Sequence, residues 1–202
     1  MGKYLFCILF IIISICATYI FTPRPFIVHH HANFAVYIDG KLFDFSPVTY
    51  MEEVSRCNIT EWVLPADRIH LHDGKGWLVH VHMAASTWGD LFANIGWSMG
   101  TSYLASGYDT MHLVDSTHSL HYIINGSIMM NPANTPVGSA DRLLVWYGTG
   151  SEQEILAKWD TLVSKDAVEY NQKSDPASCS TNTYGWLSPI ANPIVEWIEH
   201  RN

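Results

Sequence analysis

The chain has 202 residues, of which 48% are hydrophobic and 15% are charged, and its formal net charge is -8. This composition excludes a disordered chain and is sufficient for one domain or two small ones. Acidic residues outnumber basic ones by 19 to 11, and the basic residues are scattered, so no nucleic-acid partner is expected. The 11 histidines are the compositional anomaly.

The N-terminal segment contains an uncharged run, YLFCILFIIISICATYIF, over residues 4–21. The run has the length of a short membrane span and is longer than the apolar core of most cleaved signal peptides. No typical cleavage site follows it, so we expect residues 1–25 to form a signal anchor, that is, a transmembrane helix and a linker. Lys3 precedes the run and only Arg24 follows it closely, which favours a single-pass membrane protein with its body outside the cytoplasm.

The four cysteines divide into two in this run, Cys7 and Cys16, and two in the body, Cys57 and Cys179. In an oxidising compartment the second pair can form a disulfide, which would stabilise the fold by roughly 4 to 5 kcal/mol in the chain-entropy model. The alternative is two unpaired buried thiols.

The body, residues 26–180, opens with three consecutive histidines that enter an alternating apolar strand. This strand ends at an Asp39-Gly40 dipeptide, which is a strong hairpin signal. In a strand, His29 and His31 lie on one face and His30 on the other. A short helix is expected over residues 50–56.

Two H-x-H pairs then flank a glycine-rich turn in the stretch IHLHDGKGWLVHVH, which begins at residue 69. Strand periodicity pairs His70 with His72, and His80 with His82. A three-residue Gly-Lys-Gly loop beginning at Gly74 sets His70 opposite His80 and brings all four imidazoles to one face. A two-residue Gly-Lys loop would instead place the two pairs on opposite faces.

The sequence of the rest of the body predicts a capped helix, several strands and a long helix. Ser86 or Thr87 can cap a helix that stops at Gly96. The remaining expected elements are a strand at 111–114, a hairpin at 120–130 with an Asn125-Gly126 turn, a buried strand at 142–147, a helix at 152–170, and a tail at 181–202 with a short amphipathic helix. We therefore expect an α+β fold with an antiparallel or mixed, β-grasp-like sheet and short helices.

Neutral imidazole is a common ligand for copper and zinc, and three or four imidazoles satisfy one site. The candidate metal ligands are the histidines of the three H-x-H units: His29, His31, His70, His72, His80 and His82. A lone histidine on a strand is best interpreted as a surface residue, but three H-x-H units in one domain favour a metal-binding site. Asp73 and Glu53 can act as outer partners or ligands. His112, His118 and His121, which are spaced less regularly, and the terminal His200 are interpreted as ordinary polar residues.

Several segments together resemble a known group of proteins. These are H-x-H-A-N-F near residue 29, Y-M-E-E before Cys57, H-L-H-D-G, V-H-V-H with T-W-G-D-L-F-A-N-I-G, and D-P-A-S-C-S around Cys179. The group consists of uncharacterised, histidine-rich, membrane-anchored extracytoplasmic bacterial proteins, and the resemblance covers most of residues 29–180. It implies an extracytoplasmic location. Some members are named protein-disulfide isomerases, but this chain lacks the C-x-x-C that such chemistry uses.

Three functions remain open at this point. The first is a membrane-anchored extracytoplasmic protein that holds copper or zinc for metal binding, delivery or sensing. The second is a metal-dependent hydrolase or oxidoreductase, in which a histidine-bound metal keeps an open position. The third is a non-catalytic interaction module with a pH-responsive histidine surface. No nucleophile, phosphate-loop or dinucleotide motif is present, so whether the protein is an enzyme is left open.

Overall fold

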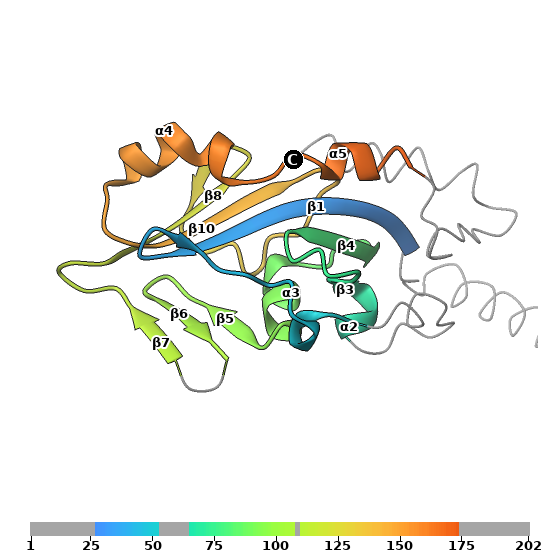
Figure 1. The fold of residues 1–202 in the computed structure, drawn as a ribbon, viewed down its shortest axis with the longest axis horizontal. Helices are drawn as coiled ribbons and strands as arrows, with labels where there is room; N and C mark the ends of the chain where they lie inside the picture. The colour runs from blue at the N-terminus through green and yellow to red at the C-terminus, as the bar shows by residue number, and fades with distance from the viewer. Residues whose placement is uncertain (1–26, 53–64, 108–109, 174–202) are drawn as a thin grey trace, which may run out of the picture.

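The computed structural model describes residues 27–52, 65–107 and 110–173 (Figure 1). The described elements are, in chain order, β1 (Ile27–Ile38), β2 (Lys41–Leu42), the 3-10 helix η1 (Val48–Tyr50), α2 (Pro65–Arg68), β3 (Ile69–His70), β4 (Leu78–Met83), α3 (Trp88–Asn94), β5 (Trp97–Met99), β6 (Tyr103–Ser106), β7 (Thr110–Leu113), β8 (Ser119–Ile124), β9 (Ser127–Met129), β10 (Arg142–Gly148), α4 (Glu152–Leu162) and α5 (Ala167–Tyr170).

The main sheet is mixed. Its strand order is β3-β4-β1-β10-β8-β9, and β2 pairs with the end of β1. The long strand β1 runs antiparallel to β4 on one side and parallel to β10 on the other. A second, antiparallel sheet of three strands has the order β5-β6-β7. These sheets and the short helices confirm the predicted α+β class, whereas the finer β-grasp assignment stays a prediction.

The main sheet buries apolar side chains on both faces. On one face Phe34 and Val36 of β1 join the larger core, which also contains residues of α3 and β5. On the other face Ala35 of β1 and Leu144 of β10 pack with Ile155 of α4. In Figure 1, α4 and α5 accordingly lie on one side of the sheet, and α3 with the second sheet lies on the other.

The two hairpins predicted from Asp-Gly and Asn-Gly are both present. Asp39 and Gly40 have φ angles of 50° and 77°, and Asn125 and Gly126 have φ angles of 51° and 82°. Two successive residues with positive φ make a turn whose twist matches that of the flanking strands. The strand pairs Ile38 with Lys41 and Ile124 with Ser127 then close directly on these turns.

The capped helix after the histidine hairpin is also confirmed. The Thr87 side chain accepts a hydrogen bond from the Asp90 backbone N–H, and the Asp90 carboxylate accepts one from the Thr87 backbone N–H. This reciprocal pair satisfies two N–H groups that a helix start otherwise leaves without partners. The helix buries Trp88, Leu91 and Phe92 against the larger core.

The single helix predicted over residues 152–170 is wrong, because the structure has two helices there. The chain leaves helical geometry at Val163, which has extended backbone angles. Arg142 at the start of β10 donates hydrogen bonds to the backbone carbonyls of Asp160, Val163 and Ser164. These bonds satisfy carbonyls at the end of α4, where a helix lacks its own donors, so the break is stabilised by a residue distant in sequence.

Several other expectations fall partly or wholly outside the described residues. Within the expected helix at 50–56, Met51 is extended, and the positions from 53 onward are not described. The anchor at 1–25, the Cys57–Cys179 pair and the amphipathic helix within 181–202 all lie outside the described residues. Among the helices of the described ranges, none is both long and apolar enough to cross a membrane.

Candidate metal centre

Three neighbouring strands bring the histidines together. In the ladder between β3 and β4, His70 lies directly opposite His80, as the spacing predicts. In the ladder between β4 and β1, His31 lies opposite His80 from the other side. His80 on the middle strand is therefore flanked by a histidine on each neighbouring strand.

The turn of the histidine hairpin differs from the predicted three-residue loop. Asp73 and Gly74 both have positive φ angles, 59° and 67°, and the Lys75 N–H donates to the His72 carbonyl. A second turn follows, in which the Leu78 N–H donates to the Lys75 carbonyl. The two consecutive turns together span the same residues as the predicted loop and its flanks, so the register is retained although the loop geometry is not.

Gly76 in the second turn is required by a close approach of the backbone. A Cβ atom at this position would lie 2.4 Å from the carbonyl carbon of Phe45 and 2.5 Å from the backbone nitrogen of Ser46. The segment after β2 therefore packs directly on the histidine hairpin and holds its turn in place.

His29, His31 and His80 form the tightest part of the cluster. Each offers one ring nitrogen, and these three nitrogens all lie within 4.8 Å of one another. The ring centroids are 5.0 Å apart for His29 and His31, 4.4 Å for His31 and His80, and 6.4 Å for His29 and His80. His31 and His80 are each 3% exposed, and His29 is partly exposed. Three imidazoles at this spacing could hold a metal ion.

The other three predicted ligands extend the same cluster. The ring centroid of His82 lies 5.1 Å from that of His29 and 4.9 Å from that of His70. The ring of His72 lies 3.5 Å from that of His80. His70, His72 and His82 are all buried, and these ring distances join all six predicted histidines in one cluster.

Two of the rings are held in a defined orientation by hydrogen bonds at Nδ1. The Nδ1 of His31 lies 2.9 Å from the side-chain oxygen of Asn171, which also accepts a bond from the His31 backbone N–H. The Nδ1 of His70 lies 2.6 Å from the carbonyl oxygen of Ala66 in α2. Both acceptors require the proton on Nδ1, which leaves the lone pair on Nε2 for a metal.

Burial keeps these imidazoles in the form that binds metals. Burial, with a smaller contribution from neighbouring histidines, lowers the pKa of His70 to about 4 and that of His82 to about 2. The same causes lower the pKa of His80 well below its ordinary value of 6.5. The three rings are therefore neutral at pH 7, and a neutral ring carries the lone pair that coordination needs.

Asp73 is the one predicted outer partner that the described residues include. Its carboxylate lies 3.0 Å from Nδ1 of His72 and 3.3 Å from the Lys75 ammonium group. Burial raises the pKa of the Asp73 carboxyl group, but His72 and Lys75 together lower it by more, so the net pKa falls below its ordinary value. The Asp73 carboxylate thus lies beside His72 and accepts a hydrogen bond from Lys75, and Glu53 lies outside the described residues.

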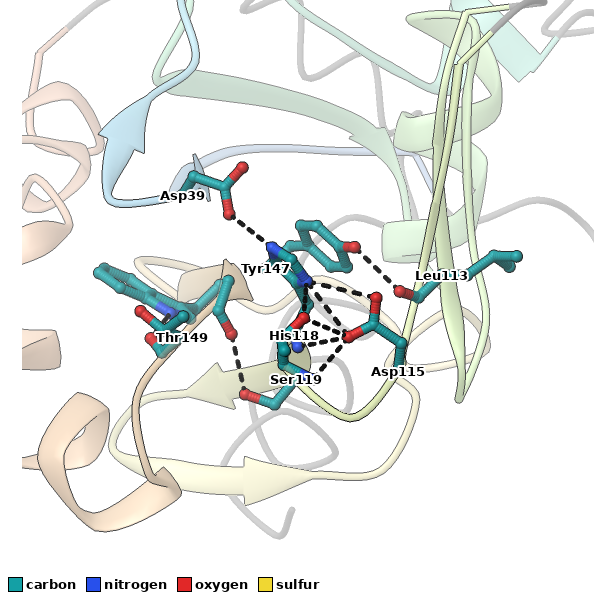
Figure 2. Close-up of polar contacts among 10 residues, drawn as sticks. Asp39, Leu113, Asp115, His118, Ser119, Tyr147 and Thr149 are labelled. Atoms are coloured by element: carbon teal, nitrogen blue, oxygen red, sulfur yellow. Dashed lines mark hydrogen bonds and ion pairs between the residues drawn. The ribbon is translucent and has the colours of Figure 1, made fainter.

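The remaining histidines have other surroundings. His30 faces away from the cluster, with its Nε2 3.0 Å from the Val137 carbonyl oxygen. Figure 2 shows His118 between two carboxylates, 3.5 Å from Asp39 and 3.2 Å from Asp115. Its ring stacks on Tyr147, whose hydroxyl group donates to the Leu113 carbonyl. His118 therefore lies outside the histidine cluster, and its assignment as an ordinary polar residue stays a prediction. His112 and His121 likewise contact serine hydroxyl groups.

Sequence reasoning missed Asn171 and the α2 carbonyl that orient the ligand rings. Asn171 follows α5 and is 140 positions from its partner His31, so no local pattern connects the two. Helix α2 has four residues and includes a proline, which gives too short a pattern for a helix to be predicted. The H-x-H spacing identifies the rings but not the groups that orient them.

A cavity of about 540 Å³ lies next to this part of the sheet, between β1, the segment after β2 and the start of α5. It is lined by Phe34, Ala35, Leu42, Phe43, Asp44, Phe45, Ser46, Gly76, Trp77, Leu162, Ser164 and Asp166. None of the six clustered histidines lines this cavity, so the candidate metal ligands do not face into it.

No protein-family model, curated protein or solved structure matches this chain. The resemblance to anchored extracytoplasmic bacterial proteins therefore stays an expectation, and a functional assignment depends on the geometry of the histidine cluster.

Proposed function

We propose that this chain is a membrane-anchored extracytoplasmic protein that binds copper or zinc through its histidine cluster, for metal binding, delivery or sensing. The observation that supports this proposal is the convergence of His29, His31 and His80, whose ring nitrogens lie within 4.8 Å of one another. Among the described residues, both ring nitrogens of His80 and Nε2 of His70 are buried without a hydrogen-bond partner, which is a costly arrangement that coordination would relieve.

The donor set favours copper and zinc over other metals. All the candidate ligands in the tight group are imidazoles, and imidazole suits zinc, copper, iron and nickel, whereas magnesium and calcium prefer oxygen. Among divalent ions, copper binds such nitrogen sites most strongly. Copper is also plausible outside the cytoplasm.

The geometry favours a binding role over a catalytic one. A metal-dependent enzyme needs an open coordination position next to a space for substrate, with an acid or base within reach. The 540 Å³ cavity contains Asp44 and Asp166 but none of the clustered histidines. The interaction-module alternative requires histidines that point in different directions, whereas these rings face one another.

Metal analysis of the full-length protein tests the proposal. The chain should be purified in detergent under native conditions without a polyhistidine tag, and its metal content measured by inductively coupled plasma mass spectrometry. We expect at least one copper or zinc ion per chain, and a large loss of metal in His29→Ala/His31→Ala. His118→Ala is the matched control and should retain the metal. A wild-type protein without metal that also fails to bind added Cu(II) or Zn(II) would contradict the proposal.

The proposed location is supported by the uncharged run at residues 4–21 and by the resemblance to extracytoplasmic proteins. Protease added to cells with a permeabilised outer envelope should digest the body while the anchor stays in the membrane. A mature, soluble form that begins near Arg24 would contradict the anchor.

A further inference from the structure

The cavity of about 540 Å³ is lined by none of the clustered histidines, but it adjoins their hairpin, because Gly76 and Trp77 just before β4 line it. Pockets that take small organic molecules typically enclose about 300 to 1,000 Å³ and combine apolar walls with a few polar groups. The size of this cavity falls within that range. Its lining residues decide which class of molecule it suits.

Aromatic side chains form much of this lining. Phe34 of β1 and Phe43 and Phe45 after β2 pack together, with the ring centroid of Phe45 5.2 Å from that of Phe34 and 4.7 Å from that of Phe43. Trp77 and Leu42 line the cavity as well, and they are 41% and 59% exposed. Large apolar side chains of this kind gain free energy when a ligand covers them. The cavity therefore suits a ligand with an apolar or aromatic body.

Two carboxylates share this lining, those of Asp44 and Asp166, and no lysine, arginine or histidine occurs among the described residues that line the cavity. The Asp166 carboxylate accepts hydrogen bonds from neutral side chains, those of Asn33, Ser164 and Trp77, at 2.7, 2.7 and 2.8 Å. Because these donors are neutral, they hold the carboxylate in place without cancelling its charge. The bond from Trp77 also fixes an exposed indole ring beside a negative charge.

Both carboxylates are ionised at neutral pH. The backbone N–H of Ser46 donates to Asp44, which lowers the pKa of the Asp44 carboxyl group. Burial raises the pKa of the Asp166 carboxyl group, but the hydrogen bonds that it accepts lower it by more, so the net pKa falls below its ordinary value. A cleft lined by charges of one sign concentrates ions of the other sign. The cavity therefore favours a cation over a neutral molecule or an anion.

We propose that this cavity binds a small organic ammonium ion, that is, a protonated amine carried on an apolar or aromatic body. The ammonium group pairs with the carboxylates of Asp44 and Asp166, and the body covers the exposed side chains of Trp77 and Leu42. An inorganic cation would leave the aromatic lining uncovered, and a neutral apolar molecule would leave the two carboxylates without a counter-ion. This inference goes beyond the proposed metal-binding function and does not depend on it.

Nuclear magnetic resonance of the full-length protein in detergent tests this proposal at the cavity itself. The tryptophans are labelled with ¹⁵N, and the indole N–H signal of Trp77 is assigned from its absence in Trp77→Phe. The protein is titrated at pH 7 with 2-phenylethylammonium chloride and, separately, with 2-phenylethanol, which is a neutral molecule of nearly the same shape. A chelator is present, so that the amine has no metal ion to bind.

We expect the ammonium ion to shift the Trp77 signal saturably and to bind roughly 5-fold or more tightly than the alcohol, because each ion pair contributes a few-fold. Asp44→Asn keeps an oxygen that can accept the Ser46 N–H bond but loses the charge, and it should weaken ammonium binding roughly 2- to 5-fold. Glu152→Gln is the matched control. It removes one negative charge at the far end of α4 from the lining residue Leu162 and should bind as the wild type does.

Three results would overturn the proposal. The first is a Trp77 signal that shows no saturable shift with the ammonium ion. The second is equal affinity for the ammonium ion and the alcohol, which would indicate an apolar cavity that does not select charge. The third is equal behaviour of Asp44→Asn and Glu152→Gln, which would show that the Asp44 carboxylate does not pair with the ligand. The comparison of the two probes uses only the wild-type chain, so it does not depend on how a variant folds.

Discussion

Acid should destabilise the metal-free protein through its buried histidines. Burial lowers the pKa of His70 from 6.5 to about 4, so between these values the unfolded chain binds a proton at this position and the folded chain does not. Stability rises with pH wherever the unfolded state binds more protons. His70 therefore costs no stability above about pH 6.5. As the pH falls from 6.5 toward 4, burial of the neutral His70 ring lowers the free energy of unfolding progressively.

The expected magnitude is large. A separation between pKa values of about 4 and 6.5 corresponds to on the order of 3 kcal/mol for His70 alone, at about 1.4 kcal/mol per pKa unit. His80 and His82 also have lowered pKa values and act in the same direction. A typical domain has a total stability of about 5 to 15 kcal/mol, so the metal-free protein should be close to unfolding at pH 4.5.

Urea unfolding of the full-length protein tests this reasoning. Unfolding is followed by tryptophan fluorescence in the presence of a chelator, at pH 7.5, 6.5, 5.5 and 4.5. His70→Gln removes one titrating group and should make stability fall less steeply with decreasing pH, whatever its effect at pH 7.5. His118→Gln, outside the cluster, controls for the loss of a histidine as such. A free energy of unfolding that stays constant from pH 7.5 to 4.5, or an unaltered slope in His70→Gln, would refute the argument.

Three further predictions concern metal affinity and packing. Burial lowers the pKa of His70, His80 and His82, so few protons compete with the metal above pH 6. The Cu(II) affinity, measured by chelator competition, should therefore fall little between pH 7.5 and 6. A decline in affinity centred on pH 6.5, as exposed histidines would give, would contradict this. Asn171→Ala removes the acceptor of the His31 Nδ1 proton and should weaken affinity by roughly 10- to 100-fold; unchanged affinity would show that Asn171 does not orient the ring. Gly89→Ala places a Cβ atom 2.5 Å from the Ala133 carbonyl oxygen and should cost about 1 to 3 kcal/mol in urea unfolding, so a neutral effect would mean that this contact relaxes freely.

Sequence periodicity could predict those parts of the site that depend on local geometry. The H-x-H spacing places alternate histidines on one face of any strand, and the register that sets His70 opposite His80 follows from the number of residues in the turn. The detail of the turn could not be predicted, because Asp73 as well as Gly74 adopts positive φ. An Asp-Gly dipeptide permits this conformation, as it does at Asp39-Gly40, but the glycine-rich sequence allowed several loops with different registers.

The rest of the site depends on contacts between distant parts of the chain. The parallel pairing of β1 with β10 joins residues more than 100 positions apart, and short-range patterns contain no information about such a pairing. The break between α4 and α5 depends on Arg142, and the orientation of His31 depends on Asn171. The strands β5 and β6 are short, at three and four residues, and a pattern of that length does not distinguish a strand from a loop.

X-ray absorption spectroscopy at the metal edge tests the central claim most directly, because it reports which atoms bind the ion in the full-length protein. For the zinc-loaded chain we predict a shell of nitrogen ligands at about 2.0 to 2.1 Å, with the outer-shell scattering of imidazole rings and a marked reduction of that scattering in His29→Ala/His31→Ala. A shell that contains sulfur at about 2.3 Å, which would indicate cysteine ligands, or one of oxygen alone without imidazole scattering, would contradict a metal centre built from these histidines.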